Sequence, residues 1–171
     1  MKVATMLLMA ALGTASAASF GADTISAEDF VKKAGESGLA EVALGKLGVE
    51  KSGNAQVRAF SQQMVADHTK ANKELTATAQ AKNLKVPTEP SMVHKGVMEK
   101  YQHQTADTDF NRDFMQRMVK DHEAAVKLFQ TAANDSTLDP DLRSFAKKTL
   151  PTLEHHLSEA QQLEATLAKK T

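Results

Sequence analysis

Long helical segments are the feature of this sequence that most restricts its fold. Apolar side chains recur every three or four residues in four segments of about 25 to 30 residues each. Ala, Leu, Lys, Gln and Glu predominate and aromatic residues make up only 5%, which excludes a β-sandwich and favours helices. We expect four long helices over residues 26–50, 54–83, 107–134 and 139–169.

The ends of these segments carry residues that start or interrupt helices. Ser26 opens an S-x-x-D capping box, and Asp139 precedes a proline suited to a first helical position. Pro151 predicts a kink in the last helix. The connection over residues 84–106 holds two prolines and a short predicted helix at 92–102. We therefore expect an all-α four-helix bundle, joined either by a long crossover or by a decorated loop in an up-down arrangement.

The N-terminal residues match a secretory signal peptide. Lys2 precedes an apolar run at residues 3–12 and the small-residue triplet Ala15-Ser16-Ala17. The run is far shorter than the roughly 20 residues that span a bilayer, and no later segment predicts a transmembrane helix. We expect export to a bacterial periplasm, with three parts: a cleaved signal peptide at 1–17, a flexible segment at 18–25 and a single domain at 26–169.

Charge and cysteine content exclude several classes of function. Because 21 basic residues balance 21 acidic ones, the chain lacks the positive excess typical of nucleic-acid binding. The absence of cysteine excludes disulfides, thiolate metal sites and a cysteine nucleophile. The sequence has no Ser-His-Asp pattern, phosphate-binding glycine loop or nucleotide fingerprint. An oxidoreductase or hydrolase is thus a weaker hypothesis than a protein without catalytic activity.

An internal repeat places two histidines on apolar helix faces. FSQQMVADH at residues 60–68 matches FMQRMVKDH at 114–122 in six of nine positions. A duplication retained for packing explains the repeated Phe and Met, but it does not explain a repeated Asp-His pair. At about 100° per residue, His68 and His122 fall within the apolar stripes of their helices.

The first and last long helices each add one inward polar residue. His156 falls on the apolar face of the last helix, whereas its neighbour His155 falls on the polar face. Glu41 is the one acidic residue on the apolar face of the first helix, where three glycines surround it. Glycine is costly inside a helix, so we expect either close approach of a neighbouring backbone or room for a group beside Glu41.

These residues predict a metal site at mid-bundle. A buried carboxylate facing three imidazoles is unfavourable unless a divalent ion such as Zn, Fe, Mn or Cu compensates it. The predicted ligands are Glu41, His68, His122 and His156. Residues expected near them are Asp67, Asp121 and Glu159, as acceptors for ring N–H groups, and Met64 and Met118, as soft ligands or simply core residues. The two aspartates point about 100° from their own histidines and should serve a neighbouring helix.

The sequence resembles the bacterial family called domain of unknown function 4142 over residues 26–168. The resemblance rests on two M-V-x-D-H units, a T-L-P-x-L-x-x-H segment, and the stretches DFVKKAGESGLAEVALGKL, VRAFSQQMVADHTKANKEL, FMQRMVKDHEAAV and LRSFAKKTLPTLEHHLSEA. It implies an exported, ferritin-like bundle, in a family with some members described as outer-membrane proteins, and it implies no activity. Ferritin-like di-iron bundles carry Glu-x-x-His on two helices, and this sequence has none.

Two functional hypotheses remain. The first is a periplasmic metal-binding protein for sequestration, delivery or stress protection. The alternative is a non-enzymatic envelope or stress helper that acts through protein–protein contacts, with its histidines hydrogen-bonded to acids in a metal-free core. Nothing in the sequence predicts a particular protein partner or an oligomeric state.

Overall fold

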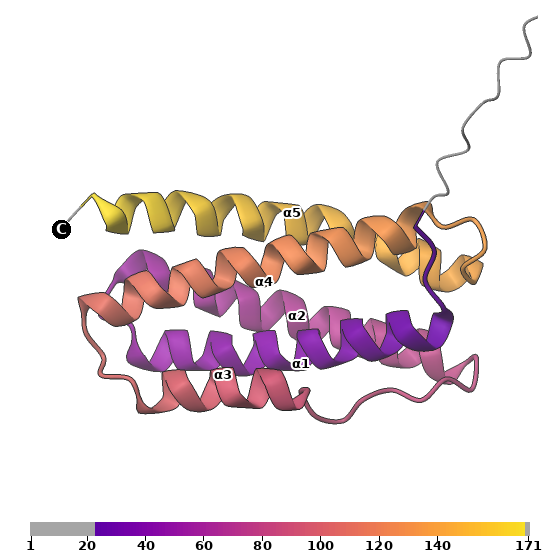
Figure 1. Cartoon of the computed structure of the whole chain (residues 1–171), viewed down its shortest axis with the longest axis horizontal. Coiled ribbons are helices and arrows are strands. Elements are labelled where there is room, and N and C mark those ends of the chain that lie inside the picture. The colour runs from indigo at the N-terminus through magenta and orange to yellow at the C-terminus, as the bar shows by residue number, and fades with distance from the viewer. Residues whose placement is uncertain (1–22, 170–171) are drawn as a thin grey trace, which may run out of the picture.

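The computed structural model describes residues 23–169, which form five helices and no strand (Figure 1). The predicted signal peptide at 1–17 lies outside these residues, and within them no helix combines the length and apolar character needed to cross a membrane. The helices are α1 (Ala27–Lys51), α2 (Ala55–Gln80), α3 (Met92–His103), α4 (Thr108–Asn134) and α5 (Pro140–Ala168). The all-helical prediction is therefore confirmed.

The helices begin where the sequence predicts, because polar side chains cap their first backbone N–H groups. Ser26 Oγ accepts a hydrogen bond from the N–H of Asp29 at 3.1 Å. Asp139 Oδ1 caps α5 in the same way, and Pro140 occupies its first turn. The last helix continues through the exposed Pro151.

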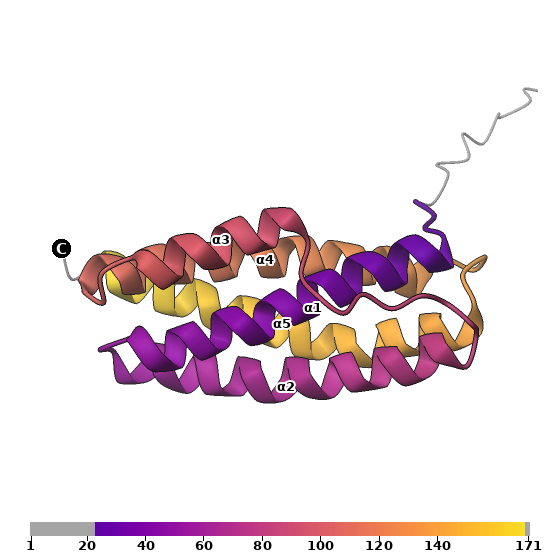
Figure 2. The ribbon, with the colours of Figure 1, turned by 90° about the horizontal axis from the view of Figure 1, so that it is seen from below.

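The long helices form two antiparallel hairpins, α1–α2 and α4–α5, that pack against each other (Figures 1 and 2). After α2, the chain runs back along the bundle, and α3 packs on α1 before α4 begins at the opposite end. The connection is therefore a crossover, and α2 and α4 run in the same direction. Lys51 Nζ stabilises the C-terminal end of α3 by donating hydrogen bonds to the backbone carbonyl oxygens of Tyr101, Gln102 and Gln104.

Glycines on α1 allow this helix to lie close to α2. A Cβ at Gly45 would come within 2.8 Å of Val65 Cγ2 and 3.1 Å of the Ser61 carbonyl oxygen. A Cβ at Gly38 would overlap the Asn72 side-chain amide. The close backbone approach expected around Glu41 is thus confirmed at Gly45.

The hydrophobic core consists of two clusters with a gap between them. One cluster surrounds Phe30, Phe129 and Phe145, toward the end where α4 turns into α5. The other contains Phe60 and Phe114, toward the end where α1 turns into α2. In each long helix, a stretch of about two to three turns at mid-length separates the buried members of the two clusters.

Candidate metal centre

Four polar side chains occupy the gap between the two hydrophobic clusters. On α5, Leu153 belongs to one cluster and Ala160 to the other, and His156 lies between them. In the same way, one polar residue of each of the other three long helices lies between members of the two clusters. This layer consists of Glu41, His68, His122 and His156, all of them buried. Mid-helix placement on packed helices has brought the three predicted histidines together, and it has placed Glu41 in the same interval between the clusters on α1.

The three histidines of this layer form a compact group. One ring nitrogen from each lies within 4.8 Å of those of the other two. Their ring centroids are 5.5 to 5.7 Å apart, and the residues are 7%, 1% and 0% exposed for His68, His122 and His156. His155, predicted to point outward, is exposed.

Hydrogen bonds define which ring nitrogens carry protons. His122 Nδ1 lies 2.8 Å from the Met118 carbonyl oxygen. His156 Nε2 lies 3.0 Å from Asp67 Oδ2. Carbonyl and carboxylate oxygens accept hydrogen bonds, so these two nitrogens carry the N–H in the neutral rings. The other nitrogen of each neutral ring therefore holds a lone pair.

Three buried ring nitrogens have no hydrogen-bond partner within residues 23–169. They are His68 Nε2, His122 Nε2 and His156 Nδ1, and we call them the open nitrogens. Leaving a buried polar atom unpaired costs about 1–3 kcal/mol. A cation bound by all three nitrogens would supply the partner that each of them lacks and would remove this cost.

Burial keeps the imidazoles neutral. It lowers the pKa of His68 well below its ordinary value, and the neighbouring His122 and His156 lower it further. Burial also lowers the pKa of His122 to about 4. The pKa of His156 is lowered for the same reason, although the Asp67 carboxylate opposes the shift. Neutral imidazole is the form that coordinates a metal ion.

Glu41 is buried in the same layer with its Oε2 unpaired among the described residues. Burial and the nearby Asp121 charge raise its pKa well above the ordinary value, and Arg117 opposes this shift. Burial thus favours the protonated, uncharged form of this carboxyl group when no cation is near. Glu41 does not belong to the 4.8 Å group of the histidines, so its role as a ligand stays a prediction.

The two aspartates of the repeat have different partners. Asp67 accepts from His156 on another helix, in agreement with its predicted direction. Asp121 instead accepts from Arg117 Nε at 2.6 Å. Arg117 was not predicted to contribute, although its i,i+4 spacing to Asp121 is a signal for such a pair.

The remaining predicted neighbours lie at the edge of the layer. Glu159 Oε2 is 3.9 Å from Nε2 of the exposed His155, so its ion-pair partner is not His156. Met64 and Met118 are fully buried in the hydrophobic cluster that contains Phe60. Core packing therefore accounts for both methionines.

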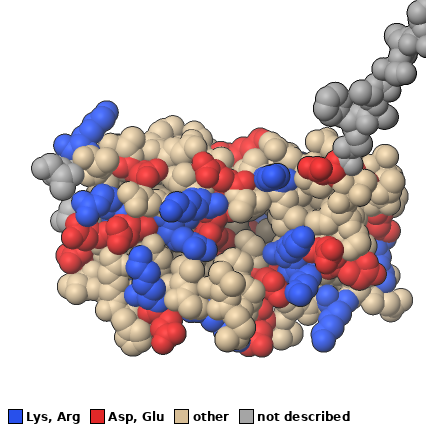
Figure 3. Space-filling model, viewed as in Figure 1, with Lys and Arg blue, Asp and Glu red and all other residues tan. Residues whose placement is uncertain are grey.

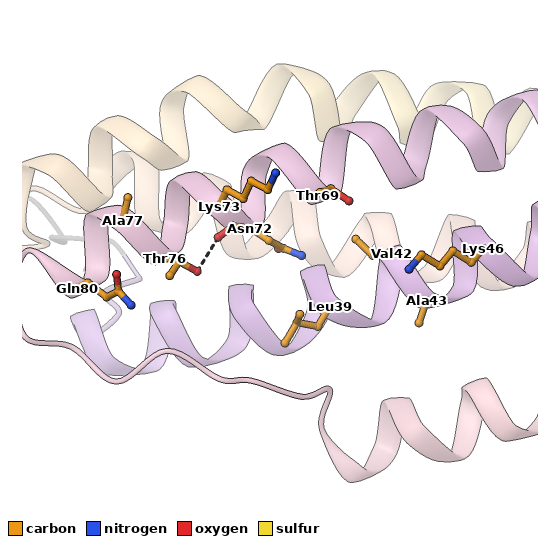
Figure 4. A pocket seen from close by; sticks show the side chains of 10 residues that line it. All are labelled: Leu39, Val42, Ala43, Lys46, Thr69, Asn72, Lys73, Thr76, Ala77 and Gln80. Carbon is orange, nitrogen blue, oxygen red and sulfur yellow. Dashed lines mark hydrogen bonds between the residues drawn. The ribbon is translucent and has the colours of Figure 1, made fainter.

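A separate groove on the surface does not include the layer. It has a volume of about 590 Å³ and lies between α1 and α2 (Figure 4). Leu39 and Val42 of α1 and Thr69 and Lys73 of α2 are among the residues that line it. None of the four layer residues lines this groove.

A family model described as "Domain of unknown function (DUF4142)" matches residues 12–163. The match includes the four layer residues and both M-V-x-D-H units. No curated protein and no solved structure matches the sequence. The function must therefore be inferred from the geometry of the layer itself.

Proposed function

The chain belongs to the family described as domain of unknown function DUF4142, and from that premise we propose that it is an exported helical-bundle protein that binds one divalent metal ion at mid-bundle. The ion would be held for sequestration, delivery or stress protection. The observation that carries this proposal is the set of three open nitrogens.

The spacing of the histidines supports a shared ion. Nitrogens around a tetrahedral zinc ion lie about 2.1 Å from the metal and thus roughly 3.4 Å from one another. Nitrogen atoms already within 4.8 Å of one another need only a small inward shift to reach that geometry. His122 and His156 are also held by their second nitrogens, which is how ligating histidines are usually oriented.

Glu41 completes the proposed ligand set. As a protonated carboxyl group it is tolerated in the core, and loss of its proton would supply a fourth donor and a charge that opposes the cation's. Three imidazoles and one carboxylate suit Zn, Fe, Mn or Cu. Asp67 would orient His156 by accepting its ring N–H. Asp121 is paired with Arg117 and Glu159 with His155, so neither of these acids is the hydrogen-bond partner of a proposed ligand.

Export and architecture belong to the same proposal. The predicted signal peptide would deliver the protein to the periplasm, where the family resemblance also points to outer-membrane association. The crossover between the hairpins supports a ferritin-like bundle. Because no Glu-x-x-His occurs in the sequence, di-iron storage and ferroxidase chemistry are not part of the proposal.

Elemental analysis of protein purified without a histidine tag tests the proposal. We expect about one metal ion per chain, lost when His68 and His122 are both changed to Gln, and a lower melting temperature after EDTA treatment. His155→Gln is the matched control, because it removes an exposed histidine beside His156 and should leave the metal content unchanged.

The opposite outcome would favour a different function. If the protein holds no stoichiometric metal and EDTA leaves its melting temperature unchanged, metal binding is rejected. The envelope or stress helper with a metal-free polar core then remains, and the double Gln variant should lose stability while keeping its protein contacts.

A further inference from the structure

A small hollow opens on the surface between α2 and α5, beside the histidine layer. Its volume is about 140 Å³, and its lining includes Asp67, Ala71 and Glu74 of α2 with Lys148 and Thr149 of α5. The hollow therefore brings two carboxylates, together with the amino groups of Lys70 and Lys148, to the side of the bundle where α2 and α5 meet.

A second, smaller cavity lies deeper in the bundle, next to His68. It has a volume of about 20 Å³, which is room for about one water molecule. His68 lines it together with residues from all four long helices, most of them apolar, with Ser37, Asn72 and Thr149 as the other polar members. Ala71 and Thr149 line both this cavity and the surface hollow, so these two residues lie between the hollow and the cavity beside His68.

Asp67 connects the hollow to the layer by a direct contact. Its Oδ2 accepts hydrogen bonds from His156 Nε2 at 3.0 Å and from Gln63 Nε2 at 2.7 Å. The Asp67 side chain is 28% exposed, whereas the His156 side chain is 0% exposed. One carboxylate thus touches solvent and a buried imidazole at the same time.

An ion pair crosses the hollow from one helix to the other. Lys148 Nζ lies 2.7 Å from Glu74 Oε1, with both side chains partly exposed. Pairs of this kind contribute little to stability, about 0–1 kcal/mol, so the pair can open at small cost. An approaching cation would then meet the carboxylates of Asp67 and Glu74.

We propose that the metal ion enters and leaves the layer between α2 and α5. It first meets Asp67 in the hollow, then passes between Ala71 and Thr149 and reaches the open nitrogen of His68. A cavity with room for one water admits a cation that has lost most of its hydration shell, and it excludes a chelated metal. This route rests on the proposed metal-binding function and specifies how that site exchanges its ion.

The absence of cysteine in the sequence permits a direct test. In Thr149→Cys, the introduced thiol is the only one, and benzyl methanethiosulfonate would place a removable plug at the passage. Zn²⁺ uptake is followed by stopped-flow absorbance with a coloured chelator, before labelling, after labelling and after reduction. We expect labelling to slow uptake and release by roughly tenfold or more, because the helices must then separate further. The equilibrium affinity should change little, and reduction should restore the rate.

Thr69→Cys, labelled in the same way, is the control, since Thr69 lines the separate α1–α2 groove (Figure 4). Its uptake rate should not change on labelling. Ala71→Cys provides a second plug position if Thr149→Cys fails to fold. Zn²⁺ uptake that is unaffected by labels at both positions overturns the route alone. Absence of uptake of Zn²⁺, Fe²⁺, Mn²⁺ and Cu²⁺ alike by the unlabelled protein overturns the metal-binding function and the route with it.

Discussion

Each of two imidazoles in the layer uses one nitrogen to hold its ring and leaves the other open. His122 is held by a carbonyl of its own helix, one turn back, and His156 by a carboxylate of α2. The bond within α4 persists as long as that helix does. The hydrogen bond from His156 to Asp67 depends on how α2 and α5 pack, so substitutions should disturb it more easily than the bond within α4.

Changing Asp67 to Ala should therefore weaken metal binding. We expect Zn²⁺ affinity to fall about 10- to 100-fold, because His156 would lose the acceptor that fixes its ring and its tautomer. Competition with a chelator of known affinity measures the effect. Gln63→Ala is the control, since it removes an exposed hydrogen bond to the same Asp67 oxygen, and it should alter affinity far less. Equal losses for the two variants would contradict the orienting role.

Metal-free protein should lose stability in acid. The pKa of His122 is lowered to about 4 in the folded protein, against about 6.5 in the unfolded chain. Between these pH values the unfolded chain binds a proton that the folded chain does not. The His122 contribution is thus fully present above about pH 6.5 and is lost as pH falls to 4, by about 3 kcal/mol in total.

Urea unfolding of the metal-free protein at pH 7, 6, 5 and 4 measures this dependence. Glu41 acts in the opposite direction, because a raised pKa gives stability at low pH that is lost as pH rises. Comparison with His122→Gln separates the two contributions, since only the wild-type protein has the His122 dependence. If the stability of wild type and variant depends on pH in the same way, the inference that His122 is buried in its neutral form is wrong.

Among the helices, α1 and α2 pack closely beside the layer because α1 carries glycines at the contact. Each glycine inside a helix costs about 1 kcal/mol relative to alanine, yet α1 keeps Gly38 and Gly45 on either side of Glu41. Both face α2 where an added Cβ would collide. The glycines thus favour close helix packing at the expense of helix propensity on both sides of Glu41.

Two glycine substitutions should have opposite effects on stability. Gly45→Ala would place a methyl group against Val65 and the Ser61 carbonyl, so we expect a loss of about 1–3 kcal/mol. Gly96→Ala lies within α3, where no described atom comes within 4 Å of the added Cβ, and it should gain about 0.5–1 kcal/mol. Chemical denaturation measures both. A stabilised Gly45→Ala protein would contradict the close approach.

Residues 23–169 form a pair of hairpins joined by a crossover, with the layer of Glu41 and three histidines at mid-bundle. Lys, Arg, Asp and Glu side chains are interspersed over the face shown in Figure 3, in keeping with the balanced charge of the sequence. The residues of the proposed metal site lie instead in the interior, and the proposed route runs from them to the α2–α5 side.

Export can be tested on the intact protein. We expect protein recovered from a periplasmic extract to have lost residues 1–17, because the Ala15-Ser16-Ala17 triplet fits a signal peptidase site. Intact-mass spectrometry measures this directly. Replacing Ala15 and Ala17 with Phe should leave the precursor uncleaved, whereas Ser16→Phe should have a smaller effect. Recovery of the full-length chain from the cytoplasm alone would count against export.

Local properties of the sequence determined the helices, their caps and the inward direction of Glu41 and the three histidines. These depend on periodicity and on residues a few positions apart, which a single helix already defines. The repeat suggested equal roles for Asp67 and Asp121, and only tertiary packing separated them. Their partners, His156 and Arg117, depend on the spacing and rotation of neighbouring helices. The crossover, the open nitrogens and the α2–α5 hollow arise in the same way, from how the helices meet.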